Sequence, residues 1–172
     1  DRPNYSLKKG FYLQNLKGFT KSQPLSLVQD SLSEYISAEV QIIQEVPSLI
    51  LGAGGSAVSP SATVFANTLV PLSDLSQKPR ILPGALANTG IVRAHDQYTF
   101  IGNHTVPNDF GTAPDSYILK NGLIDQTLTM FGMVTDAQWV DLNDDDLEDL
   151  VVVGEWMAPR FLLQTPEGFI ET

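Results

Sequence analysis

Residues 141–154 read DLNDDDLEDLVVVG and are the most informative stretch of the chain. Six acidic side chains fall within residues 141–149, and an apolar run begins where they stop. Adjacent carboxylates repel one another, so a folded chain tolerates them where solvent or a cation offsets the charge. The run at 150–153 is short and rich in β-branched valine, which is typical of a strand. We therefore expect an acidic loop that leads directly into a strand.

Oxygen-bearing groups recur at alternating positions of this loop. Positions 1, 3, 5 and 9 carry side-chain oxygens and position 7 offers a carbonyl: Asp141, Asn143, Asp145, Asp149 and the backbone of Leu147. Ca²⁺ binds about 6–8 hard oxygen ligands in flexible geometry, so the spacing favours a calcium site. The loop is not an EF-hand, because that motif needs Gly at position 6 and Glu at position 12, where this chain has Asp146 and Val152. The alternative is a solvated acidic turn, since Asp and Asn tolerate turn dihedrals.

The composition argues against several kinds of partner and site. A formal net charge of −10 disfavours nucleic acid and anionic membranes as partners. The chain has no cysteine, so it holds neither a disulfide framework nor a thiolate metal site. Hydrophobic residues make up 42% of the chain, which is enough for a core, and no apolar run approaches the ~20 residues of a membrane span. No signal peptide is recognisable, so an exported protein would here be in its mature form.

Three apolar runs end in a similar way, at Gly52, Gly102 and Gly154. These glycines, which we call the marker glycines, are 50 and 52 residues apart. A period of this size indicates stacked supersecondary units, such as the blades of a propeller. The alternative is chance recurrence of strand and turn patterns in an all-β sandwich.

Other segments keep the same phase as the marker glycines. Residues 117–122 follow the second run and 160–165 follow the third, while 68–72 match more weakly after the first. From Gly90 to Gly102 is 12 residues, whereas from Gly132 to Gly154 is 22, so the middle unit lacks a loop of ten residues. We expect four parts: the end of a preceding blade and a linker at 1–37, blades without a metal loop at 38–89 and 90–131, and a blade with the acidic loop at 132–172.

The pattern Asp-x-Asn-x-Asp-x-x-x-Asp-Leu-Val-Val-Val-Gly, with residues 132–139 before it and 154–157 after it, resembles the repeat of FG-GAP/VCBS proteins. That family forms integrin-like β-propellers, and the likeness is greatest to its bacterial surface and secreted members. The family has Gly at loop positions 4 and 6, where this chain has Asp144 and Asp146. Asp visits left-handed dihedrals more readily than most residues, so the loop is still expected to close. The resemblance implies four-stranded antiparallel blades, Ca²⁺ in loops between strands, and adhesion, ligand binding or assembly.

The expected fold is therefore all-β, an incomplete propeller segment of about three four-stranded blades. Propellers have at least four blades, and folded proteins avoid exposed sheet edges. The remaining blades would come from the same longer chain or from a partner.

Other candidate sites have weaker signals. His95 and His104 belong to no visible cluster of zinc ligands. The glycine-rich residues 52–56 lack the Lys-Ser/Thr of a phosphate-binding loop. Neighbouring loop carboxylates are poorly suited to the fixed separation of a glycosidase pair. We interpret Trp139 and Trp156 as residues that pack between blades, with a sugar-binding platform as the alternative.

The leading functional hypothesis is a non-catalytic, extracytoplasmic binding or scaffold module of a β-propeller protein, stabilised by Ca²⁺. It has no catalytic residues, and its ligand would be a protein or a glycan. One alternative is a subunit of an outer-membrane or secretion assembly. Another is part of a propeller-type carbohydrate-active enzyme.

Overall fold

The chain of the computed structural model divides into two units, Asp1–Ser31 and Leu32–Thr172. The structure describes residues 11–13, 23–25, 34–54, 67–73, 80–82, 87–107 and 109–172. In the first unit, β1 (Phe11–Leu13) pairs with β2 (Gln23–Leu25) in a two-stranded antiparallel sheet. The other described strands all belong to the second unit.

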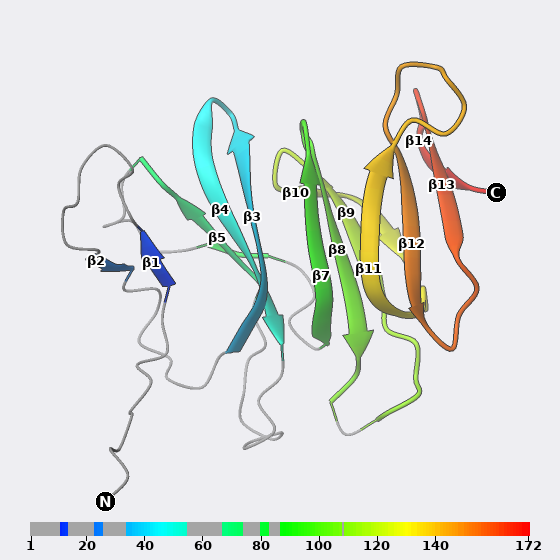
Figure 1. Cartoon of the computed structure of the whole chain (residues 1–172), viewed down its shortest axis with the longest axis horizontal. Helices are drawn as coiled ribbons and strands as arrows, with labels where there is room; N and C mark the ends of the chain where they lie inside the picture. The colour runs from blue at the N-terminus through cyan, green and yellow to red at the C-terminus, as the bar shows by residue number, and fades with distance from the viewer. Residues whose placement is uncertain are drawn as a thin grey trace, which may run out of the picture. The chain divides into compact units, whose positions relative to one another are not determined.

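Three four-stranded antiparallel sheets make up the second unit, and each follows the order of the chain (Figure 1). Sheet 1 contains β3 (Glu34–Ile43), β4 (Val46–Gly54), β5 (Thr68–Pro71) and β6 (Arg80–Ile81). Sheet 2 contains β7 (Asn88–His95), β8 (Tyr98–Thr105), β9 (Ser116–Lys120) and β10 (Leu123–Leu128). Sheet 3 contains β11 (Met133–Val140), β12 (Asp149–Glu155), β13 (Arg160–Thr165) and β14 (Gly168–Glu171).

The prediction of an all-β fold is confirmed, and the described residues contain no helix and close no barrel. Sheet 1 begins at Glu34, within the residues 1–37 that we expected to hold a linker. Among the described residues, no helix is long and apolar enough to cross a membrane.

The first strands of the three sheets, β3, β7 and β11, lie side by side (Figure 1). The strand β3 shows why. Its residues alternate between an exposed face and a face turned toward sheet 2, as side chains in a strand do. Ser37 on the inner face donates to the carbonyl of Val92 in β7 at 3.4 Å and accepts from the N–H of Val92 at 3.0 Å. This reciprocal pair ties the first strand of sheet 1 to the first strand of sheet 2.

The marker glycines occupy corresponding places in the three sheets. Each lies on the second strand and pairs with the first strand directly beside a register shift: Gly52 with Ser37, Gly102 with Ile91, and Gly154 with Val134. Such shifts are β-bulges, which bend a strand and increase its twist.

Two of these glycines allow neighbouring sheets to approach closely. A Cβ atom added at Gly52 would lie 2.8 Å from Val92 Cγ2 in β7, and one added at Gly102 would lie 2.5 Å from Val134 Cγ1 in β11. Separations this short are not tolerated between carbon atoms, so a larger residue would push the sheets apart. The marker glycines of sheets 1 and 2 thus face the first strand of the following sheet.

Two hydrophobic clusters fill the spaces between the sheets. Between sheets 1 and 2 lie Ile43, Ile50, Leu69, Leu82, Val92, Ile101 and Leu119. A larger cluster joins sheets 2 and 3, and it includes aromatic residues from both. There Phe169 makes edge contacts with the rings of Tyr98 at 5.1 Å and Trp139 at 5.6 Å. Sheet 2 is therefore packed on both faces.

The two tryptophans have different environments. Trp139 is 7% exposed and belongs to the core between sheets 2 and 3, as predicted. Trp156 is 78% exposed, so its predicted role in packing is wrong. It lies in the connection after β12 with a positive φ of 53°, and its side chain is directed away from the core.

Candidate metal-binding loop

The acidic loop is the connection between β11 and β12, residues 141–148. The corresponding connections are two-residue turns, Gln44–Glu45 in sheet 1 and Asp96–Gln97 in sheet 2. All three lie at the same end of the sheets, at the top of Figure 1. Gln44 and Glu45 have φ of 50° and 68°, the type I′ pattern that matches the twist of a tight hairpin. Sheet 3 alone has a long loop at this place.

Asp141 organises the first half of the loop. Its Oδ1 accepts hydrogen bonds from the backbone N–H groups of Asn143 and Asp145, both at 3.3 Å. Its Oδ2 accepts from the N–H of Asp146 at 3.0 Å. Burial acts to raise the pKa of Asp141, but the backbone N–H groups around it outweigh that effect and hold the pKa below its ordinary value. Asp141 therefore stays an anion and an acceptor.

Asn143 and Asp145 direct oxygens toward the same stretch of backbone. Asn143 Oδ1 accepts from the N–H of Asp145 at 3.1 Å, and Asp145 Oδ1 accepts from the N–H of Leu147 at 2.9 Å. Asn143 Nδ2 also donates to Asp145 Oδ2 at 2.9 Å. The side-chain oxygens of loop positions 1, 3 and 5 are thus gathered by one hydrogen-bond network.

The loop closes through left-handed residues at positions 4 and 6. Asp144 and Asp146 have φ of 60° and 64°, the region that favours glycine. The FG-GAP/VCBS pattern has glycine at these two positions. Asp tolerates this conformation better than most residues, so the substitution preserves the path of the loop.

Asp149 has a different environment from the other predicted ligands, because it is fully buried. Its Oδ2 accepts from the N–H of Leu142 at 3.0 Å, and its Oδ1 accepts from the N–H of Gln164 in β13 at 2.8 Å. A buried carboxylate requires such hydrogen bonds to offset its lost hydration. Asp149 therefore ties the start of the loop to β13. Each of its oxygens keeps a second lone pair, so these bonds do not remove it from the predicted ligand set.

Carboxylates alone do not form a metal site in the loop. In the described part of the chain, no group of three or more His, Asp or Glu side chains converges on one point as a metal site would require. The predicted set depends also on the Asn143 amide and the Leu147 carbonyl. Carboxylate, amide and carbonyl oxygens are the donors that Ca²⁺ accepts.

Each histidine contacts a residue outside the loop. The ring of His95 is 6.3 Å from that of Trp139, and His104 Nε2 is 3.6 Å from Glu155 Oε2. Of the glycine-rich stretch, Gly52, Ala53 and Gly54 belong to β4, and residues 55–56 lie outside the described residues.

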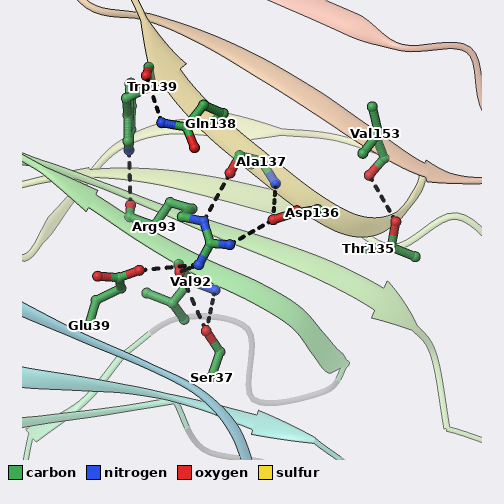
Figure 2. A network of polar contacts seen from close by, with 10 residues as sticks. All are labelled: Ser37, Glu39, Val92, Arg93, Thr135, Asp136, Ala137, Gln138, Trp139 and Val153. Carbon is green, nitrogen blue, oxygen red and sulfur yellow. Dashed lines mark hydrogen bonds and ion pairs between the residues drawn. The ribbon is translucent and has the colours of Figure 1, made fainter.

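A polar bridge that the sequence did not predict joins the three sheets at Arg93 of β7 (Figure 2). Its Nη1 lies 3.2 Å from Glu39 Oε1 in β3, and its Nη2 lies 2.8 Å from Asp136 Oδ1 in β11. Its Nε donates to the carbonyl of Ala137 at 2.9 Å. The Trp139 indole completes the bridge by donating to the carbonyl of Arg93 at 3.2 Å. One guanidinium thus contacts the first strands of both neighbouring sheets.

Comparison with protein-family models, with curated proteins and with solved structures finds no match to this chain. The resemblance to FG-GAP/VCBS repeats rests on the residues around the acidic loop.

Proposed function

We propose that this chain is a non-catalytic scaffold or binding segment of a β-propeller protein of the FG-GAP/VCBS type. The observation that carries the proposal is the relation of two marker glycines to the next sheet. Gly52 lies against Val92 of sheet 2 and Gly102 against Val134 of sheet 3, in each case a valine of the first strand. In stacked repeat proteins each unit packs against the next one, so further units can be added at either end.

Both ends of the array of sheets leave apolar residues in solvent. On β3, the alternate residues Ile36, Val40 and Ile42 are exposed. On sheet 3, Val153, Phe161 and Ile170 are exposed. Three blades are too few for a ring, so further blades, from the same longer chain or from a partner, would cover these faces. The same faces favour the second candidate function, a subunit of a larger outer-membrane or secretion assembly.

The acidic loop is proposed to bind Ca²⁺ through Asp141, Asn143, Asp145, the Leu147 carbonyl and Asp149. Support comes from the hydrogen-bond network that gathers the oxygens of the first three, and from the burial of Asp149 beside β13. The ion would hold the β11–β12 connection in place, which is a structural role. We propose an extracytoplasmic location for a module that is stabilised in this way by a calcium ion.

A non-catalytic role is supported by the state of the loop carboxylates. A general acid requires a raised pKa, whereas the pKa of Asp141 is lowered by backbone N–H groups. Both oxygens of Asp149 accept backbone hydrogen bonds. These two carboxylates are engaged in holding the loop together.

Thermal unfolding with Ca²⁺ or with a chelator tests the proposal. Binding to the native state alone would add about 2.7 kcal/mol at one hundred times Kd, so the melting temperature should rise with Ca²⁺. Asp145→Ala should remove most of this increase. Asp144→Asn is the matched control and should keep it, because position 4 of the loop lies outside the proposed ligand set and Asn also tolerates the left-handed φ of this position. An unchanged melting temperature in the unsubstituted protein would show that the loop is only an acidic turn.

A further inference from the structure

Two exposed aromatic side chains from different sheets meet at one end of sheets 2 and 3. Phe110 lies in the connection between β8 and β9, and Trp156 in the connection between β12 and β13. Their exposed fractions are 68% and 78%, yet their ring centroids are 5.3 Å apart at an interplanar angle of 79°. The acidic loop lies at the opposite end, because it precedes β12 whereas Trp156 follows it. We call these two rings the aromatic corner.

Neither ring is needed for the core. Trp156 keeps most of its surface in water, although its transfer to an apolar environment would be favourable. Its φ of 53° is also unfavourable for a bulky residue. Residues held in such conformations concentrate at binding sites and other functional positions.

The backbone beside Phe110 is held in place. Near Phe110, the N–H of Asp109 donates to the carbonyl of Val106 at 3.1 Å, and Thr112 Oγ1 donates to Asp109 Oδ2 at 2.9 Å. Gly111 lies against the indole, since a Cβ atom added there would be 3.6 Å from Trp156 Cζ3. Because these contacts order the connection that carries Phe110, and the two rings already meet, binding would lose less conformational entropy than it would at two separate mobile rings.

Polar side chains lie at the ends of the two strands that lead into the corner. Glu155 directly precedes Trp156, and its Oε2 lies 3.6 Å from His104 Nε2 at the end of β8. Both side chains are partly exposed and offer hydrogen-bond groups to a ligand. The two strands that lead to the aromatic rings thus carry an imidazole and a carboxylate at their ends.

We propose that the aromatic corner of Phe110 and Trp156 binds the apolar face of a pyranose ring in a saccharide. A pyranose presents C–H groups on its face, which suit the negative face of an aromatic ring. It presents hydroxyls around its edge, which suit Glu155 and His104. The proposal names the ligand class of the binding module proposed above, and it rests on that function.

The size of the corner favours a small ligand over a protein surface. Two aromatic side chains bury at most about 500 Å² together, whereas a stable protein interface needs about 800 Å² on each partner. A site with a few convergent polar groups beside aromatic side chains is typical of small-molecule recognition.

The indole N–H signals of the ¹⁵N-labelled protein provide the test. The protein has two tryptophans, so two such signals are expected. Trp139 donates its indole N–H to the carbonyl of Arg93 inside the fold and serves as the internal reference. The probes are the methyl pyranosides of glucose, galactose, mannose and N-acetylglucosamine and their β-linked oligosaccharides. Sorbitol is the matched control ligand, because it has the hydroxyls without the ring face.

At least one saccharide should shift the Trp156 signal in a saturable way and leave the Trp139 signal unchanged. Sorbitol should shift neither signal. Phe110→Ala should weaken binding about tenfold or more, and so should Trp156→Ala. Binding to Trp156→Ala is read from backbone signals, because that variant has lost the Trp156 indole. Leu123→Ala, an exposed apolar residue in β10, should bind as the unsubstituted protein does. The proposal is overturned if no saccharide in the panel shifts the Trp156 signal or if Phe110→Ala binds saccharides normally. It is also overturned if the cation tetramethylammonium, which tests for a site that recognises cations by their contact with aromatic rings, is the one probe that shifts the signal. A calcium effect on melting that persists in such a case would leave the proposed scaffold function standing.

Discussion

Gly102 in β8 faces Val134 in β11 so closely that an added Cβ atom would lie 2.5 Å from the valine methyl Cγ1. One sheet earlier, Gly52 also lies against a valine of the next first strand, Val92, at 2.8 Å. These two glycines therefore recur in the sequence because a larger side chain would leave no room for the first strand of the next sheet.

Gly102→Ala should destabilise the protein by about 1–3 kcal/mol, the usual effect of overpacking a core. Part of the loss should return in the background Val134→Ala, because the smaller side chain makes room for the added methyl group. Recovery will be incomplete, since the Phe100 ring also lies close to this glycine. Denaturant unfolding of the four proteins of this double-mutant cycle measures the coupling. Strictly additive effects would show that the two residues do not share the contact.

Arg93→Met should lower the free energy of unfolding by about 1–2 kcal/mol, because it leaves the carboxylates of Glu39 and Asp136 without their shared partner. The pairs are partly exposed, so the effect should shrink as salt rises. Arg93→Lys should not restore stability, since an ammonium cannot contact both carboxylates and the Ala137 carbonyl in the same fork geometry.

A matched control for Arg93 lies within sheet 3. Arg160 Nη1 is 3.0 Å from Glu171 Oε2, a pair of similar exposure that connects no other sheet. Glu171→Gln should change stability by no more than about 0.5 kcal/mol. If the two substitutions have equal effects, the bridge between the sheets has no special importance.

Asp149→Asn should destabilise the protein by about 2 kcal/mol or more, because an amide can present only one oxygen to two backbone donors. The amide nitrogen would face the N–H of Leu142 or of Gln164. Amide hydrogen exchange should then accelerate at one of these two residues. Asp144→Asn, in the exposed part of the loop, serves as the control and should leave both amides protected. Unchanged exchange in Asp149→Asn would contradict the role assigned to the two hydrogen bonds that Asp149 accepts.

Much of the fold was predictable from local patterns. Residues 150–153, 117–122 and 160–165 read as strands and lie in or overlap strands of the structure, and the acidic residues form the expected loop. Strand periodicity and turn residues are local properties, so a single sequence is enough to show them. The marker glycines were also visible, because their spacing survives in the order of the chain.

The long-range polar contacts were not predictable in the same way. Glu39, Arg93 and Asp136 are separated by 54 and 43 residues, and they meet only after three strands adopt one register. Trp156 was misinterpreted because its position depends on a positive φ at the end of β12, which the residue type does not indicate. Asp149 carries the same side chain as its exposed neighbours, and only the approach of β13 shows that it is buried.

If the three sheets are part of a larger ring or array, the 172-residue chain should not be a stable monomer, and its mass in solution shows whether it is. Size-exclusion chromatography with light scattering measures it. The exposed faces of β3 and sheet 3 should drive association or poor solubility, because each sheet depends on its neighbours for core. The net charge of −10 slows association without covering those faces. We predict species larger than 18.8 kDa or loss of soluble protein. A monodisperse monomer of 18.8 kDa that melts cooperatively would show that the three sheets are stable without further blades.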